Sequence, residues 1–267
     1  MFQTISNFMR VRDIRSKIFF TLLVLIVFRI GTFVPVPNVD ATALQQTDNN
    51  LIGLLNVFGG GALSNFSILA MGIMPYITAS IIVQLLQMDV VPKFTEWAKQ
   101  GDVGRRKLAQ FTRYFTIILA FIQAIAMSFG FNRMYDGQLI KSEGVSTYVV
   151  IAIVLTAGTA FLLWLGEQIT AKGVGNGISI IIFAGIVAAI PNAVNQLYAT
   201  QIQGAGDALF IKLAIMLLLL LVIIAVTVGV IYVQEALRKI PIQYAKRVTG
   251  RGQSTGGQQT HLPLKLN

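Results

Sequence analysis

Six long apolar runs constrain this chain more than any other feature of its sequence. A helix needs about 20 mostly apolar residues to cross the hydrocarbon core of a bilayer, and each run is close to that length. The predicted spans are Ile18–Val34, Phe66–Met88, Tyr114–Phe131, Tyr148–Leu165, Val174–Leu197 and Leu209–Gln234. Only 12% of the residues are charged, about half the share typical of soluble domains. We therefore expect an all-α polytopic membrane protein, and neither a disordered chain nor an ordinary soluble enzyme.

The positive charges fall on one side of these predicted spans. Alternating spans place four segments on the same side of the membrane, and those segments carry 17 of the 21 Lys and Arg residues. They are residues 1–17, 89–113, 166–173 and 235–267. Because cytoplasmic loops collect Lys and Arg, we expect both ends of this chain to be cytoplasmic. Apolar residues at helical spacing among basic ones predict that residues 1–17 form an amphipathic surface helix, with a solvated tail as the alternative.

The residues that usually carry chemistry are scarce. The chain has no cysteine and a single histidine, His261, in a polar loop. No Asp, Glu or His lies in the middle of a predicted span, whereas proton-coupled carriers use such groups as relays. We therefore predict no catalytic residue, no metal site and no cofactor, and hence no enzyme. Arg29 is the one charge well inside a predicted span, where it either has a function or extends toward the outer interface.

Residues 51–65 are apolar but too short to span a membrane. Gly59, Gly60 and Gly61 would interrupt a helix there. The segment is either re-entrant, which requires burial in protein or a water-filled cavity beside it, or a helix lying flat on the outer leaflet. A re-entrant segment would indicate an internal funnel, and the residues alone leave both readings open.

Isoleucines repeat at helical spacing in the second and fifth spans. Ile73, Ile77 and Ile81 form one stripe beside Pro75, which is predicted to kink the second span. Ile178 and Ile182 repeat the same spacing in the fifth span. Such a stripe usually faces lipid or packs against a neighbour, but it can also form a hydrophobic constriction that closes a pore by excluding water. Periodicity does not decide between these uses.

Basic clusters mark two loops that are predicted to be cytoplasmic, residues 89–113 and 235–267. Their most prominent members are Arg105, Arg106, Lys107, Arg238, Lys239, Lys246, Arg247 and Arg251. Such clusters bind anionic lipid and fix topology, or they dock an acidic protein surface or RNA phosphates. Lipid binding and topology are the default use of such clusters, but the second loop is longer than topology requires, which adds weight to docking there.

Four stretches of the chain resemble the SecY family of protein-conducting channels. They are Phe66–Leu85, Trp164–Phe183, Arg29–Pro37 and Thr260–Lys265. The resemblance extends over essentially the whole chain. It implies ten membrane helices in two five-helix halves, with a pore between the halves. This chain would then be the N-terminal part of such a channel, and its remaining spans would lie beyond residue 267.

The resemblance divides the chain into parts and assigns residues to them. Residues 18–197 would be the N-terminal half, 198–234 would hold the sixth helix, and 235–267 would be a basic cytoplasmic loop. The re-entrant plug helix would lie in 51–65, with the plug itself at Asn56, Val57, Phe58, Gly59, Gly60, Gly61, Ala62, Leu63 and Ser64. The pore ring would include Ile73, Ile77, Ile178 and Ile182. The second span would form one wall of a lateral gate.

The resemblance also implies a function and partners. The chain would belong to the central subunit of a protein translocation channel in the bacterial plasma membrane. That channel passes unfolded preproteins across the membrane and releases transmembrane segments into it. The basic loops would dock the SecA motor or the ribosome, and SecE and SecG would be membrane partners. Preprotein signal sequences and the lipid bilayer are further expected partners, and direct DNA binding is not expected.

Two other functions fit six spans with basic cytoplasmic loops. One is half of a small-solute secondary transporter, which needs a polar binding site near the bilayer midplane. Asn176, Gln123 and Gln84 are the polar residues from which such a site could be built. The other is a non-transporting membrane scaffold whose basic loops recruit partners.

Overall fold

The computed structural model describes residues 11–40, 59–88, 90–135, 137–141, 144–202, 209–242 and 260–265. The chain separates into two compact units, Met1–Ala193 and Val194–Asn267, and each is described by itself. Most of the described residues are helical, as the apolar runs predict. The helices of the first unit are α2 (Arg12–Gly31), α5 (Met74–Gln87), α6 (Pro92–Lys99), α7 (Asp102–Met134), α8 (Val145–Lys172) and most of α9 (Gly177–Leu197).

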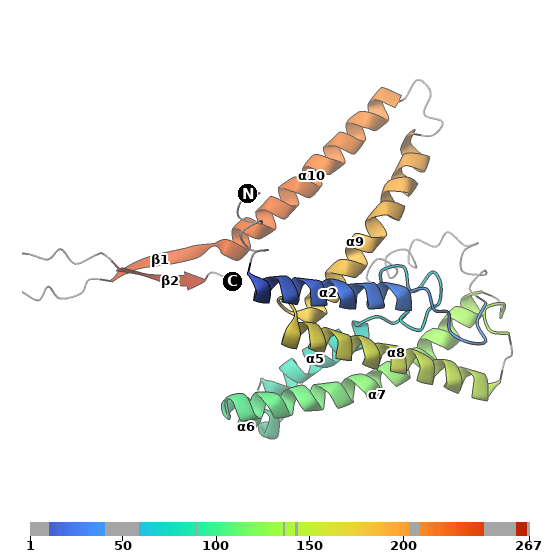
Figure 1. Ribbon diagram of the computed structural model, residues 1–267, viewed down its shortest axis with the longest axis horizontal. Helices are drawn as coiled ribbons and strands as arrows, with labels where there is room; N and C mark the ends of the chain where they lie inside the picture. The colour runs from blue at the N-terminus through green and yellow to red at the C-terminus, as the bar shows by residue number, and fades with distance from the viewer. Residues whose placement is uncertain are drawn as a thin grey trace, which may run out of the picture. The chain divides into compact units, whose positions relative to one another are not determined.

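Helices α7 and α8 run side by side in the first unit, and α5 and α6 pack against α7 (Figure 1). The buried face of α7 carries a residue at every fourth position, and all of these except Leu108 are small or polar. They are Gly104, Leu108, Thr112, Thr116, Ala120, Ala124, Ser128 and Asn132. Small side chains let neighbouring backbones approach closely, which is how helices associate where lipid removes the hydrophobic drive. The threonines and Ser128 satisfy their hydroxyl groups on carbonyl oxygens four residues earlier.

The predicted second span is wrong over its first third. Residues Phe66–Ile73 form turns, and α5 begins only at Met74. Pro75 is the second residue of α5, so it starts this helix and does not kink it. A proline is tolerated in the first turn of a helix but breaks the hydrogen bonding upstream. The 14 residues of α5 span about 21 Å, which is less than the hydrocarbon core of about 30 Å.

The turn segment that precedes α5 is buried inside the protein. Phe66 and Ser67 are almost fully enclosed, and the segment is fastened to the chain that follows α2. The amide of Val36 donates to the carbonyl of Phe66 at 3.0 Å, and the amide of Ile68 donates to the carbonyl of Val34 at 2.9 Å. The segment is therefore apolar because it is buried in protein, not because it crosses lipid.

Within the described residues, four helices are long and apolar enough to cross a membrane: α7, α8, α9 and Phe210–Glu235 of the next unit. The pair α5 and α6 would make a fifth if it is taken together, although it bends by 92°. The predicted count of six spans is therefore not confirmed. Helix α2 is 20 residues long but includes Arg12, Asp13, Arg15, Lys17 and Arg29. It begins within residues 1–17, of which residues 1–10 lie outside the described part.

The second unit contains one long helix and a β-hairpin. The unit begins in the last turn of α9, followed by a π-helical turn, η1 (Tyr198–Ile202), and by α10 (Leu209–Glu235). Strand β1 (Leu237–Ile242) then pairs with β2 (Thr260–Lys265) in antiparallel register, with Ile240 opposite Leu262. The all-α expectation is wrong here, because backbone pairing orders part of the segment that we expected to be a loop. Alternation of Leu262 and Leu264 with polar residues or proline is the period-two signal for this strand.

Candidate functional site

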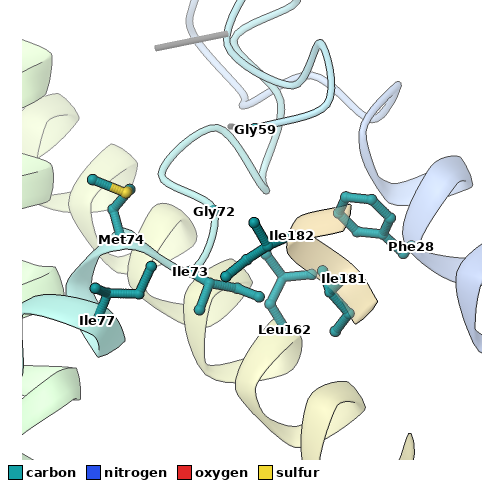
Figure 2. A pocket seen from close by; sticks show the side chains of 9 residues that line it. All are labelled: Phe28, Gly59, Gly72, Ile73, Met74, Ile77, Leu162, Ile181 and Ile182. Carbon is teal, nitrogen blue, oxygen red and sulfur yellow. The ribbon is translucent and has the colours of Figure 1, made fainter. Parts of the chain in front are cut away.

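A small apolar pocket lies where α5, α8 and α9 meet the buried turn segment. Its lining comprises Phe28, Gly59, Gly72, Ile73, Met74, Ile77, Leu162, Ile181 and Ile182. Figure 2 shows Ile73 and Ile182 close to each other at its centre, with Gly59 on the loop beside them. The volume open to the centre of a water molecule is about 20 Å³, enough for about one water. The pocket is therefore too small for more than about one water, and it offers no hydrogen-bonding side chain.

Three of the four isoleucines that the resemblance assigns to a pore ring line this pocket. Ile73 is the N-cap residue of α5 and is buried, and Ile77 follows one turn later. Ile182 comes from α9. Ile178 lies one turn earlier on α9 and lines a different, more polar groove. The structure thus brings together Ile73, Ile77 and Ile182 from two helices, and it places Ile178 beside them on the polar side.

An asparagine fixes the start of α9 and hence the position of its isoleucines. The Asn176 side-chain oxygen accepts hydrogen bonds from the amides of Ile178 at 3.1 Å and Ser179 at 3.4 Å. This is N-capping, which satisfies amides that have no partner within the helix. Asn176 is therefore already engaged in holding the helix terminus.

The segment expected to be a plug is described only in part. Asn56, Val57 and Phe58 lie outside the described residues. The described part, Gly59 to Ser64, is a series of turns, so no helix is present there. Ala62 and Leu63 are buried in the two cores of the first unit, and Gly59 lines the apolar pocket.

A polar groove of about 740 Å³ lies between α5, α7 and α8. One wall is a polar stripe on the otherwise apolar α5, formed by Tyr76, Ser80, Gln84 and Gln87. The opposite side includes an ion pair between Arg113 of α7 and Glu167 of α8. Sequence reasoning missed this groove. The spacing of the α5 stripe at i, i+4, i+8 and i+11 was a usable signal, whereas the pairing of Arg113 with Glu167 depends on tertiary structure.

The predicted docking residues occupy two places. Arg105, Arg106 and Lys107 are exposed in the first turns of α7. Arg238 and Lys239 are exposed on β1 of the hairpin. Lys246, Arg247 and Arg251 lie outside the described residues.

The three amides considered for a solute site do not form one cluster. Gln84 lines the polar groove and donates to Ser80 at 3.3 Å. Asn176 also borders that groove, but its side-chain oxygen caps α9. Gln123 lines a separate apolar pocket with Met71 and Met127.

Comparison with known proteins gives one consistent result. The SecY family model matches residues 67–267. Protein translocase subunit SecY of Bacillus licheniformis is 69% identical over 268 residues, covering 100% of this chain and 62% of that protein. Protein translocase subunit SecY of Bacillus subtilis is also 69% identical, with the same coverage of both chains. This chain therefore spans about three fifths of the length of these relatives.

Solved structures share the fold at low sequence identity. A protein-conducting channel aligns with a TM-score of 0.54 and 18% identity, covering 96% of this chain and 54% of that one. Sec61 in the canine ribosome-channel complex from the endoplasmic reticulum aligns with a TM-score of 0.53 and 18% identity, covering 87% of this chain and 51% of that one. A SecY protein whose plug domain stabilises the closed state of the translocation channel aligns with a TM-score of 0.53 and 21% identity. The alignment covers 96% of this chain and 53% of that one. The SecY family model matches most of the length of this chain. This chain therefore belongs to the SecY family.

Proposed function

We propose that this chain forms the N-terminal part of the central subunit of a protein translocation channel. The channel passes unfolded preproteins across the bacterial plasma membrane and releases transmembrane segments into the bilayer. The observation that carries the proposal is the narrow isoleucine pocket, with Gly59 in its lining and a polar groove beside it. No covalent chemistry is required of the chain.

The apolar pocket suits a seal that must open for polypeptide and close to ions. An ion that enters a constriction of Ile73, Ile77 and Ile182 loses its hydration and gains no polar ligand. Flexible aliphatic side chains can still make room for a passing chain of varied shape. We propose that these residues, with Ile178, form part of the pore ring, and that residues 56–64 form the plug.

The polar groove suits a hydrated approach to that constriction. The hydroxyl and amide groups of Tyr76, Ser80 and Gln84 can exchange hydrogen bonds with the backbone of an extended chain without favouring one sequence. The same helix, α5, carries Ile77 at the apolar pocket. We propose that α5 forms one wall of the lateral gate, through which signal sequences reach lipid.

The basic residues suit a cytoplasmic docking surface. Arg105, Arg106 and Lys107 crowd one exposed helix start, and Arg238 and Lys239 extend on the hairpin. Such clusters attract acidic protein surfaces and RNA phosphates. We propose that they dock the SecA motor and the ribosome, that SecE and SecG complete the channel, and that both ends of this chain are cytoplasmic. Sec61 has been seen in a ribosome-channel complex, which supports the ribosome as a partner. We also propose that this chain crosses the membrane six times.

The decisive experiment measures ion leak through the full-length protein in planar bilayers with its membrane partners. Ile77→Ser introduces a hydroxyl group into the apolar pocket, which should stabilise water there and raise resting conductance. Ile153→Ser on α8 is the matched control, because Ile153 is 55% exposed and lines none of the pockets described above. We expect leak from the first variant and none from the second.

Crosslinking separates the alternative functions. A preprotein arrested during translocation should crosslink to a photoreactive residue at position 77 and not to one at position 153. Equal conductance of Ile77→Ser and the parent, with no crosslink at position 77, would favour a scaffold. Uptake of a small solute by vesicles that contain the protein, with no preprotein transport, would favour a transporter.

A further inference from the structure

Arg29 reaches from α2 to the turn beside the apolar pocket. Its Nη1 atom donates a hydrogen bond to the carbonyl oxygen of Gly60 at 2.6 Å. Its guanidinium carbon lies 4.8 Å from the centre of the Phe33 ring. Gly60 belongs to the turn Gly59–Ser64, and its neighbour Gly59 lines the pocket. The cation thus connects α2 to the turn whose first described residue, Gly59, lines the pocket.

The carbonyl of Gly60 is the main polar group that compensates this charge within the described part of the chain. The ion pairs found there join Lys17 to Asp13 and Arg113 to Glu167, and neither includes Arg29. A cation inside a membrane helix is costly unless it is paired or hydrogen-bonded. A charge-assisted hydrogen bond is also roughly twice as strong as a neutral one. The Arg29 charge is therefore stabilised by the Gly60 carbonyl, and the turn is stabilised by the hydrogen bond that Arg29 donates.

The turn offers its carbonyl in a fixed direction because it is wedged between two helices. Gly60 has φ +64°, a left-handed conformation that glycine adopts without strain. A Cβ atom at this position would lie 3.0 Å from the Cα of Gly185 in α9 and 3.5 Å from the Phe28 ring of α2. The space between α2 and α9 at this position therefore accommodates glycine but no larger residue. The Ser64 hydroxyl donates to the carbonyl of Gly61 at 2.8 Å, which closes the turn on itself.

We propose that Arg29 is a latch that holds the turn Gly59–Ser64 in its closed position over the pocket. The proposal deepens the proposed channel function and rests on it. When the turn leaves, the guanidinium loses its acceptor, and water entering through the opened channel must replace it. The latch therefore favours the closed state while the channel is dry and releases once the channel fills. Loss of one charge-assisted hydrogen bond shifts such an equilibrium by roughly 10-fold to 100-fold.

The test follows the turn and the leak separately in the full-length protein, reconstituted with its membrane partners. Ser64→Cys introduces a reporter thiol into this chain, which has no cysteine of its own. The parent and every variant carry this substitution, so loss of the hydrogen bond from Ser64 to Gly61 affects all of them alike. We expect Arg29→Gln to raise both the rate at which a water-soluble maleimide labels the thiol at position 64 and the resting conductance, each by roughly 10-fold or more. Arg133→Gln is the matched control, because Arg133 is an exposed arginine in the last turn of α7. Its labelling rate at position 64 and its resting conductance should equal those of the parent.

Arg29→Lys keeps the charge but not the planar guanidinium fork, so it should fall between the parent and Arg29→Gln. A labelling rate at position 64 that is unchanged in both Arg29 variants would overturn the latch. If Arg29→Gln does not fold, a labelling rate at position 64 in Arg29→Lys equal to that of the parent would overturn the latch in the same way. Leak in Ile77→Ser without faster labelling in Arg29→Gln would reject the latch and leave the channel in place. Faster labelling in Arg29→Gln without leak in Ile77→Ser would support the latch and reject the assignment of Ile77 to the pore.

Discussion

At Gly158, α8 touches the turn segment so closely that a single methyl group does not fit. A Cβ atom added there would overlap the carbonyl oxygen of Ile68. That backbone is fastened by two hydrogen bonds, from the Ile68 amide to the Val34 carbonyl and from the Val36 amide to the Phe66 carbonyl. The neighbour cannot move aside without losing those bonds. Gly158→Ala should therefore destabilise the protein by about 1–3 kcal/mol, the usual cost of overpacking. The measurement is the midpoint of thermal unfolding in detergent.

Gly130→Ala is the matched control for this prediction. Gly130 lies on α7, and a methyl group added there would have no atom within 4 Å, while alanine favours helix by up to about 1 kcal/mol over glycine. Its midpoint should stay level or rise. A midpoint for Gly158→Ala equal to that for Gly130→Ala would contradict the close approach of α8 to Ile68.

Single residues were predictable where one helix face decides their position. The i, i+4 repeat placed Ile73, Ile77 and Ile81 on a common face. Ile73 and Ile77 do line the apolar pocket, although Ile73 is the N-cap of α5, whereas Ile81 is exposed. Periodicity could not show that Ile178 points to the polar groove while Ile182 points to the pocket, because that depends on how α9 is rotated against α8. The contact between Arg29 and Gly60 was equally hidden, since it joins elements that only the fold brings together.

Elements were predictable where their length and composition both matched a membrane helix. The runs that became α7, α8, α9 and α10 were long enough that hydropathy alone identified them. Residues Phe66–Ile73 are as apolar but fold into turns, because Pro75 prevents a helix from extending upstream. The hairpin of β1 and β2 was missed because its strands are short and rich in basic residues and proline.

Capping provides a prediction for α9 as an element. Asn176→Ala removes the acceptor of the Ile178 and Ser179 amides, which should cost about 0.5–2 kcal/mol. The first turn carries Ile178, so its loosening should also raise ion leak through the channel. Asn176→Ser should retain most of the stability, because serine is a good N-cap residue.

Asn192→Ala provides the comparison, because Asn192 is exposed farther along the same helix. Thermal midpoints and resting conductance of the three variants give the result. A midpoint and a conductance for Asn176→Ala equal to those for Asn192→Ala would show that the cap is dispensable.

For the molecule as a whole, the sequence predicted a membrane orientation more directly than it predicted tertiary contacts. The bias of 17 of 21 Lys and Arg residues toward one set of loops depends only on the order of the spans. The arrangement of helices around a pocket depends on side-chain packing that periodicity does not encode. Charge patterning and packing are therefore independent sources of information about this chain.

The predicted orientation can be measured with single cysteines, because this chain contains none. Lys107→Cys and Lys239→Cys lie in the basic segments, and Lys141→Cys lies in a loop on the other side of the predicted spans. Cytoplasmic loops collect positive charge because translocating it is disfavoured. In intact cells, a maleimide that cannot cross membranes should therefore label position 141, and it should label positions 107 and 239 only after the membrane is opened. The unsubstituted full-length protein corrects for thiols elsewhere. Labelling of position 107 or 239 in intact cells would reverse the orientation and remove those residues from any cytoplasmic docking surface.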